Sequence, residues 1–270
     1  MSNNLTGENL FSFSDQKLPA LFIGHGSPMN AIEDNEFSRS WEELGKTLPR
    51  PHAILCISAH WETRGTQVTA MTQPETIHDF GGFPQELFEY QYPAPGSPEL
   101  AKLVQEIVQL TKVEPDLSWG LDHGTWSILT KIYPEADIPI VQLSLDRTKE
   151  PAYHYALGKE LRALRNRGVM IIGSGNIVHN LRFLSFQITA YDWAIEFDTL
   201  IKQLIEKGDH ESIVNFRNLG KAAQLSIPTS EHFLPLLYIL ALQEETDSLR
   251  FFAEQFSMGS LSMSSVCLEA

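Results

Sequence analysis

Short apolar runs alternate along the chain with longer segments whose apolar residues recur at helical spacing. Four such runs lie at 19–24 ("PALFIG"), 53–58 ("AILCIS"), 138–145 ("IPIVQLSL") and 169–175 ("VMIIGSG"). They are close to continuously apolar, whereas a strand with one face in solvent alternates apolar and polar residues. We therefore predict that the four runs are strands buried on both faces of a sheet.

The segments between these runs carry helix signals. Ser97 is a good N-cap with Pro98 at the first helical position behind it, and Gly168 is placed to end a helix. The helix predicted at 35–48 repeats apolar residues on one face. The remaining predicted helices lie at 97–110, just after His123, at 150–168, at 191–208 and at 226–243, and a last strand is predicted at 259–268.

This alternation of strands and helices predicts an α/β fold with a mainly parallel central sheet that helices cover on both faces. No repeat or change of composition marks a second domain. We expect residues 1–17 to be a polar N-terminal extension and residues 18–270 to form a single catalytic domain.

Composition narrows the class of protein. The chain has 270 residues, of which 43% are hydrophobic and 20% charged, and a mean hydropathy of -0.15. A net charge of -14 and a pI near 5.0 argue against a nucleic-acid or anionic-membrane partner. We see no signal peptide and no apolar run of the roughly 20 residues that span a membrane. Two cysteines, Cys56 and Cys267, are expected to be buried hydrophobes, and the protein to be cytoplasmic.

Histidines follow three of the predicted strands: His25, His60 and His179. Any one of them could be a structural imidazole, as we expect of the histidines at 52, 154 and 210. However, ligands of open α/β sheets bind outside the carboxyl ends of the strands. Because two strands deliver His25 and His60 to the same edge, and imidazole is the commonest ligand of transition metals, the pair indicates a metal site.

A metal site needs a third ligand, and His232 in "TSEHFLP" is the best candidate. It lies at or just before the first turn of an apolar helix, which is a rigid position. Glu231 beside it is the competing ligand, although a carboxylate at this place is better explained as a cap near the helix N-terminus. No short metal-binding signature such as HExxH occurs in the sequence.

Seven motifs of the chain resemble one family in their order. "GHGSP", "SAHW", "HDFGGFP", "YPAPGSP", "DHGTW", "GSGNIVHNL" and "EHFLPLLY" are similar to those of the DOPA 4,5-extradiol dioxygenases, which are class III extradiol ring-cleaving enzymes related to the catalytic subunit of protocatechuate 4,5-dioxygenase. The resemblance extends from about residue 18 to the C-terminus. It implies an enzyme that cleaves DOPA or a related catechol with O₂ and a divalent metal.

The resemblance also implies roles for single residues. His25, His60 and His232 would bind the metal, and His179 would be either a fourth ligand or the acid–base catalyst. His123 would be a second catalytic histidine that binds the substrate. Three histidines can hold Zn²⁺, whereas the oxygen chemistry needs Fe²⁺, so both ions are candidates. One histidine that titrates near neutrality could accept a phenolic proton and later return it.

The glycine- and proline-rich stretch 74–98 predicts an ordered loop. Within it, "HDFGGFP" offers His78 and Phe83 as residues that enclose an aromatic substrate, together with Phe80. The competing interpretation is a tight turn whose phenylalanines only fill the core. Both remain open at this point.

Three other functions compete with ring cleavage. A zinc-dependent hydrolase on the same fold is the main alternative, and a metal-binding protein with a closed site is another. A serine hydrolase is set aside because no G-x-S-x-G elbow occurs. The sequence does not choose among the arginines that could bind a substrate carboxylate, which are Arg39, Arg50, Arg64, Arg147 and Arg182.

Overall fold

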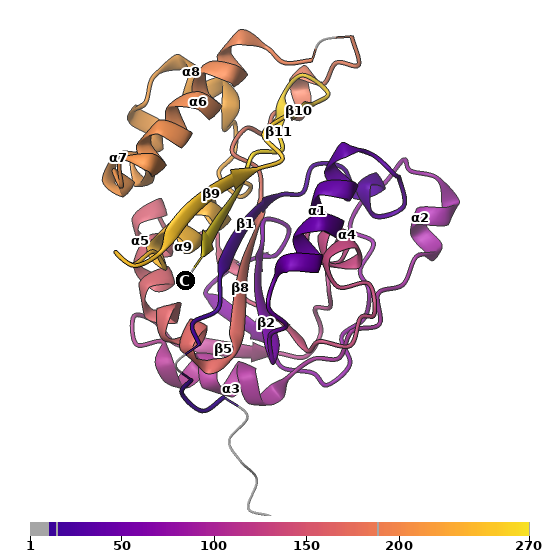
Figure 1. Ribbon diagram of the computed structural model, residues 1–270, viewed down its shortest axis with the longest axis vertical. Coiled ribbons are helices and arrows are strands. Elements are labelled where there is room, and N and C mark those ends of the chain that lie inside the picture. Colours follow the sequence, from indigo (N-terminus) through magenta and orange to yellow (C-terminus); the bar gives the residue numbers. More distant parts are fainter. Residues whose placement is uncertain (1–10, 15, 188, 270) are drawn as a thin grey trace, which may run out of the picture.

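A computed structural model describes residues 11–14, 16–187 and 189–269. A six-stranded sheet forms its centre, in the order β6-β2-β8-β1-β12-β9 (Figure 1). The first four of these strands are parallel, and β12 and β9 are antiparallel to their neighbours. The strands are β1 (Ala20–Gly24), β2 (Ala53–Ser58), β6 (Ile140–Gln142), β8 (Val169–Gly175), β9 (Ser248–Phe252) and β12 (Ser265–Glu269).

Helices cover both faces of the central sheet. Figure 1 shows α1 and α4 on one side of the strands and α5 and α9 on the other, and the members of each pair pack against each other. The helices are α1 (Glu36–Thr47), α2 (Gln85–Glu89), α3 (Pro98–Ile107), α4 (His123–Ile132), α5 (Pro151–Leu161), α6 (Asp192–Glu206), α7 (His210–Val214), α8 (Lys221–Ser226) and α9 (Leu234–Ala241). The predicted α/β architecture is confirmed.

The central sheet has a hydrophobic core on each face, and its buried strands contribute side chains to both. In β1, Phe22 packs into the core under α5 and α9, whereas Leu21 and Ile23 pack into the core under α1 and α4. Because successive side chains of a strand point to opposite faces, a strand covered on both faces must be apolar at every position. This explains the continuous apolar runs. Cys56 and Cys267 are both buried and free, as predicted.

The short strands pair outside the central sheet. Three two-stranded sheets form: β3 (Glu62–Thr63) with β7 (Leu145–Asp146), β4 (Thr66–Thr69) with β5 (Val113–Asp116), and β10 (Phe256–Ser257) with β11 (Leu261–Ser262). The predicted strand at 138–145 is therefore two strands, because the chain leaves the central sheet after β6 and then pairs with β3.

Several predicted boundaries are confirmed and others shift. β2 and β8 occupy the predicted ranges, and Ser97 caps α3 by accepting a hydrogen bond from the backbone N–H of Leu100. The helix predicted at 150–168 changes into a 3₁₀-helix at Arg162–Arg167 and ends at Gly168, whose φ is 72°. The loop predicted at 74–98 contains the short helix α2, and β9 carried no sequence signal that we recognised.

Near the amino ends of β1 and β8 the fold buries an ion pair. Arg165 donates to both carboxylate oxygens of Asp247, at 2.6 and 3.0 Å, and neither side chain is exposed. Lys17 lies 2.7 Å from the same carboxylate. Arg165 also donates to the backbone carbonyls of Leu18, Leu242 and Leu268. We call Arg165 and Asp247 the amino-end ion pair.

The predicted N-terminal extension lies partly outside the described residues, because 1–10 and 15 are not among them. In the described part, Phe11 is buried and the backbone N–H of Ser14 donates to the carbonyl of Asn166. Within the described part of the chain, no helix combines the length and apolarity that crossing a membrane requires.

Candidate active site

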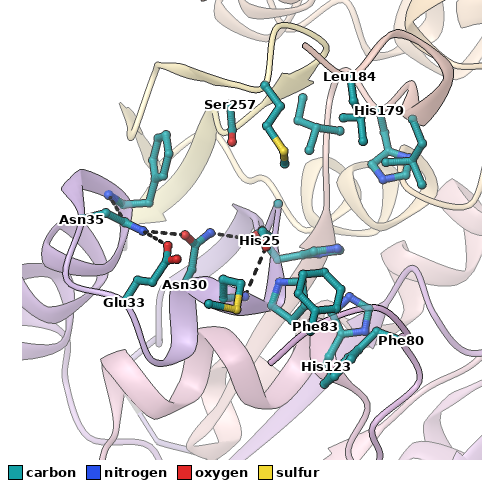
Figure 2. A pocket seen from close by; sticks show the side chains of 18 of the residues that line it. His25, Asn30, Glu33, Asn35, Phe80, Phe83, His123, His179, Leu184 and Ser257 are labelled. Atoms are coloured by element: carbon teal, nitrogen blue, oxygen red, sulfur yellow. Dashed lines mark hydrogen bonds between the residues drawn. The ribbon is translucent and has the colours of Figure 1, made fainter. Parts of the chain in front are cut away.

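Histidines from distant parts of the sequence meet at one edge of the central sheet. His25 directly follows β1, His60 follows β2, and His179 lies shortly beyond β8. These strands are parallel, so their carboxyl ends share an edge. His123 begins α4 and His232 stands just before α9. All five line one pocket of about 1110 Å³ (Figure 2), and we call them the imidazole cluster.

The three histidines predicted as metal ligands form a nearly equilateral triangle. The ring centroids of His25 and His60 are 5.0 Å apart, those of His60 and His232 are 5.0 Å apart, and those of His25 and His232 are 5.3 Å apart. His179 stacks on His232 with a centroid separation of 3.4 Å and an interplanar angle of 5°. The structure thus brings together the predicted metal ligands and the fourth candidate.

His123 lies as near to this triangle as His179 does. Its ring centroid is 3.9 Å from that of His60 and 5.6 Å from that of His25. Potential ligand atoms of these three histidines lie within 4.8 Å of one another, and so do those of His179, Glu231 and His232. Two separate sets of three donors can therefore hold a metal ion, and His123 belongs to the first of them.

The hydroxyl of Ser174 fixes the tautomer of His25. Ser174 Oγ donates its only proton to the carbonyl of Gly124 at 2.5 Å. It must therefore accept a hydrogen bond from His25 Nδ1, which lies 2.9 Å away. His25 then carries its proton on Nδ1 and presents the lone pair of Nε2 to the pocket.

Carboxylates lie beside three other imidazoles. Asp79 Oδ2 lies 3.0 Å from His123 Nδ1 and 3.4 Å from His60 Nδ1. Glu231 Oε1 lies 3.1 Å from His232 Nδ1 and is its hydrogen-bond partner. A carboxylate can only accept, so His232 Nδ1 carries the proton and His232 Nε2 keeps its lone pair. This is how ligating histidines are usually oriented in metal sites.

The cluster suits a divalent metal ion. His25 Nε2 and His60 Nε2 are 3.0 Å apart and are hydrogen-bond partners. Because His25 carries its proton on Nδ1, His60 Nε2 is the donor, and a cation bound between the two nitrogens would take the place of that proton. Imidazole nitrogens bind divalent metals such as zinc at about 2.0–2.1 Å, so a single ion could contact both nitrogens. The donor set therefore fits a metal ion.

Burial keeps four imidazoles of the cluster neutral, which are those of His25, His60, His179 and His232. It is the main reason that the pKa values of His25 and His232 fall well below the usual range, and neighbouring imidazoles lower both further. Burial also lowers the pKa of His60 to about 3 and that of His179 to about 4. Burial alone would raise the pKa of Asp79, but its hydrogen bond from His123 and the nearby imidazoles lower it. Neutral rings beside an ionised carboxylate are ready to bind a cation.

Glycines allow the elements that carry these histidines to approach closely. A Cβ on Gly124 would lie 2.6 Å from Ser58 Oγ and 2.9 Å from a ring carbon of His60. A Cβ on Gly175 would lie 2.1 Å from the carbonyl oxygen of His232. Side chains at these two positions would push His60 and His232 out of the cluster.

Residues of the loop 74–98 differ in their relation to the pocket. Phe80 and Phe83 line it, and their ring centroids are 5.4 Å apart. His78 does not line the pocket, because its Nε2 is bonded to the carbonyl of Tyr90 at 2.9 Å and its ring packs against Trp126. The predicted substrate contact of His78 is thus replaced by a role in bracing the loop. Asp79, the next residue, is the one that reaches the cluster.

The pocket has an apolar wall and a polar wall. The apolar wall continues from Phe80 and Phe83 through Leu181, Leu184, Phe186, Met258 and Leu261, and the polar wall contains Asn30, Glu33, Asn35, Glu36 and Arg39. Figure 2 shows Asn30, Glu33 and Asn35 on the opposite side of His25 from Phe80, Phe83 and His123. The cluster opens into space for a small molecule, which a closed metal-binding protein would lack.

Comparisons with known proteins agree with this site. The family described as the catalytic LigB subunit of aromatic ring-opening dioxygenase matches residues 19–268. A 4,5-DOPA dioxygenase extradiol of Escherichia coli (strain K12) is 51% identical over 94% of this chain and 95% of its own length. The enzyme of the same name from Beta vulgaris is 37% identical over 90% of this chain and 94% of its own.

The fold has a close counterpart among solved structures. A crystal structure of an uncharacterized protein of Escherichia coli K12 superimposes with a TM-score of 0.81 and 45% sequence identity, covering 93% of this chain and 99% of that one. The family and the curated relatives named above are dioxygenases, so nothing in these matches supports the hydrolase alternative.

Proposed function

The chain belongs to the family of the catalytic LigB subunit of aromatic ring-opening dioxygenase, and we propose that, as an extradiol enzyme of this family, it cleaves DOPA or a related catechol. The family confirms the predicted enzyme class. The choice of DOPA is supported by the names of relatives that align over most of the chain.

One observation carries the assignment of the site: five imidazoles from distant parts of the sequence gather in a pocket that also has an aromatic wall. We assign His25, His60 and His232 to the metal because their rings surround one centre at nearly equal distances. His179, stacked on His232, is the fourth ligand or the acid–base residue. His123 is assigned to the substrate because its ring also faces Phe80 of the aromatic wall, with centroids 5.5 Å apart.

The metal that these histidines hold is Fe²⁺ in the active enzyme, and Zn²⁺ would bind to the same donors without supporting catalysis. Iron(II) supplies the electron transfer to O₂ that ring cleavage requires and that zinc, which has no redox chemistry, does not supply. The residues of this chain supply the rest: they orient the ring, exclude water and move protons.

His179 accepts a proton from a catechol hydroxyl at its Nε2 and returns it when the ring opens. His123, whose backbone N–H donates to Asp79 and whose Nδ1 lies 3.0 Å from Asp79 Oδ2, presents its ring to the oxygen atoms of the substrate. Phe80 and Phe83, which line the pocket, pack against the catechol ring in the offset or edge-to-face contacts that aromatic rings prefer. The apolar wall keeps bulk water from the reacting atoms.

The test is oxygen consumption. Protein reconstituted with Fe²⁺ under anaerobic conditions, then mixed with air-saturated buffer and DOPA, should consume O₂ and give a ring-opened product that absorbs visible light. The same protein loaded with Zn²⁺ should do neither. Absence of O₂ uptake by the iron-loaded protein on DOPA, dopamine and 4-methylcatechol would overturn the proposal.

A further inference from the structure

A single cationic side chain lies at the pocket. Among the residues that the structure describes, Arg39 alone of the lysines and arginines lines it. Of the other arginines that the sequence left as possible carboxylate partners, Arg50 pairs with Asp137 instead, and Arg64, Arg147 and Arg182 are absent from the lining. Of the five arginines that the sequence left as candidates for binding a substrate carboxylate, only Arg39 therefore lies at the pocket.

Arg39 stands beside two carboxylates that also line the pocket, Glu33 and Glu36. Glu36 and Arg39 are three residues apart on α1, so they share one face of the helix. All three side chains are exposed at the mouth of the pocket. The two carboxylates within the cluster region, Asp79 and Glu231, are already engaged with imidazoles. The mouth therefore offers both signs of charge to a ligand.

Hydrogen bonds tie this polar wall to the imidazole cluster. Asn30 Nδ2 donates to the carbonyl of His25 at 3.0 Å, and Asn35 Nδ2 donates to Asn30 Oδ1 at 2.8 Å (Figure 2). Asn35 Nδ2 also lies 3.4 Å from Glu33 Oε2. Asn35 caps α1, the helix that carries Glu36 and Arg39. The charged groups thus have a fixed position relative to His25.

The present partner of Arg39 leaves it free to bind a ligand. Arg39 Nη1 lies 2.8 Å from Asp34 Oδ1, but the two side chains are 58% and 82% exposed. Exposed ion pairs contribute little, because water screens them and both side chains lose freedom. A guanidinium has five donors, and one contact to Asp34 leaves the others available for a carboxylate.

We propose that Arg39, Glu33 and Glu36 form a specificity subsite for the zwitterionic head group of an amino-acid catechol. Arg39 binds the α-carboxylate, and Glu33 and Glu36 bind the α-ammonium, while the catechol ring lies between the imidazole cluster and the phenylalanines. This subsite rests on the proposed function and deepens it: the substrate class is para-substituted catechols that carry both charges.

The test uses four catechols whose para side chains carry different charges. DOPA carries both, 3,4-dihydroxyphenylpropionate carries the carboxylate, dopamine carries the ammonium, and 4-methylcatechol carries neither. For Arg39→Gln, we expect kcat/KM for the two carboxylates to fall about tenfold more than for the other two, the size expected for one charged hydrogen bond. For the double variant Glu33→Gln/Glu36→Gln, kcat/KM should instead fall more for the two substrates that carry the ammonium, DOPA and dopamine, than for the other two.

Arg50→Gln is the matched control, because Arg50 is 57% exposed and also paired with an exposed aspartate, but lies outside the pocket. It should leave the ratios among the four substrates unchanged. Anaerobic binding of DOPA to the Arg39→Gln protein gives a second measurement that needs no turnover, and it should be weakened to the same extent.

The outcomes separate the subsite from the reaction. Two results would overturn the subsite and leave the proposed dioxygenase activity intact. One is that the wild-type enzyme cleaves DOPA and 4-methylcatechol equally well. The other is that Arg39→Gln has the same ratios of kcat/KM among the four substrates as Arg50→Gln. Iron-loaded protein that cleaves none of the four catechols overturns the proposed function, and the subsite with it.

Discussion

At the carboxyl ends of β1, β2 and β8 the molecule gathers the imidazole cluster, and near the amino ends of β1 and β8 it buries Arg165 against Asp247. Both regions place polar groups inside the fold, and both join residues far apart in sequence. They differ in charge. The cluster assembles groups that could only become positive, whereas the amino-end ion pair sets opposite charges against each other.

This difference decides what each region can do. In the cluster, burial and neighbouring imidazoles lower the pKa values of His25, His60 and His232, which therefore stay neutral near pH 7 and can each offer a ring nitrogen to a cation. At the other end, hydrogen bonds from Arg165 and Lys17 lower the pKa of Asp247 although burial would raise it. The ion pair is satisfied within the protein, so it serves stability. The cluster requires a cation from outside, so it serves binding and catalysis.

The largest effect should come from removing a metal ligand. His25→Ala and His232→Ala should abolish metal binding and lower the ring-cleavage rate by about 10⁴-fold or more, which corresponds to over roughly 5 kcal/mol of activation free energy. Metal content by elemental analysis and O₂ uptake measure the two losses.

Stability should behave differently in the same variants. The metal-free His25→Ala protein should unfold in urea with a free energy within about 1 kcal/mol of metal-free wild type, since residues arranged for function rather than for stability can be replaced at little cost to the fold. A variant that keeps its metal and activity would remove His25 from the proposed ligand set.

The amino-end ion pair should show the reverse pattern. Arg165→Met leaves the buried carboxylate of Asp247 with Lys17 as its remaining counter-charge and frees three backbone carbonyls. Breaking a buried pair from one side costs about 3–5 kcal/mol. Urea unfolding should show this loss, while kcat of the folded, iron-loaded enzyme stays unchanged.

The double variant Arg165→Met/Asp247→Leu sharpens this comparison. It should recover part of the lost stability, because no buried carboxylate remains and Lys17 keeps Glu244, 3.1 Å away, as a partner. If Arg165→Met had the wild-type free energy of unfolding, or lowered kcat as the histidine variants do, it would be wrong that the amino-end ion pair serves stability and the imidazole cluster serves catalysis.

Within the cluster, His123 should separate catalysis from metal binding. His123→Ala should keep the wild-type metal content and lose about 10²-fold in kcat, roughly 2.7 kcal/mol, the scale of one proton-transfer group. His210→Ala removes an imidazole that is bonded to Tyr155 outside the pocket and is the matched control. Loss of metal from His123→Ala would instead favour the alternative donor set of His25, His60 and His123.

The sequence predicted His25, His60 and His179 from a simple rule: parallel strands deliver their last residues to one edge of a sheet. His232 was predicted from its place just before an apolar helix, whereas His123 was implied only by the family resemblance. Sequence reasoning failed where an irregular loop determines the direction in which a side chain points. His78 and Asp79 are neighbours, and only the folded loop shows that His78 turns toward Tyr90 and Asp79 toward His123. The hydroxyl of Ser174, which fixes the tautomer of His25, had no sequence signal either.

The amino-end ion pair could not be predicted from the sequence, for a related reason. Arg165 and Asp247 meet because a 3₁₀-helix precedes β8 and a turn precedes β9. Neither element has the hydrophobic period that reveals a buried strand or an amphipathic helix. A buried charge leaves no periodic trace in a sequence, whereas the strands around it do.

The smallest of the expected effects is the pH dependence of the amino-end ion pair. Because the pKa of Asp247 is lower in the folded protein than in the unfolded chain, where it is about 3.9, the folded state binds fewer protons in this range. The stabilisation is therefore complete above about pH 5 and is lost as the pH falls through the lowered pKa of the folded state. Measured by urea unfolding of metal-free protein, wild type should exceed Asp247→Asn by a constant amount near neutrality, and the gap should narrow in acid. Glu245→Gln, which removes an exposed carboxyl nearby, should track wild type throughout. A gap that stayed constant down to pH 3 would mean that Asp247 does not hold its charge in the way the structure indicates.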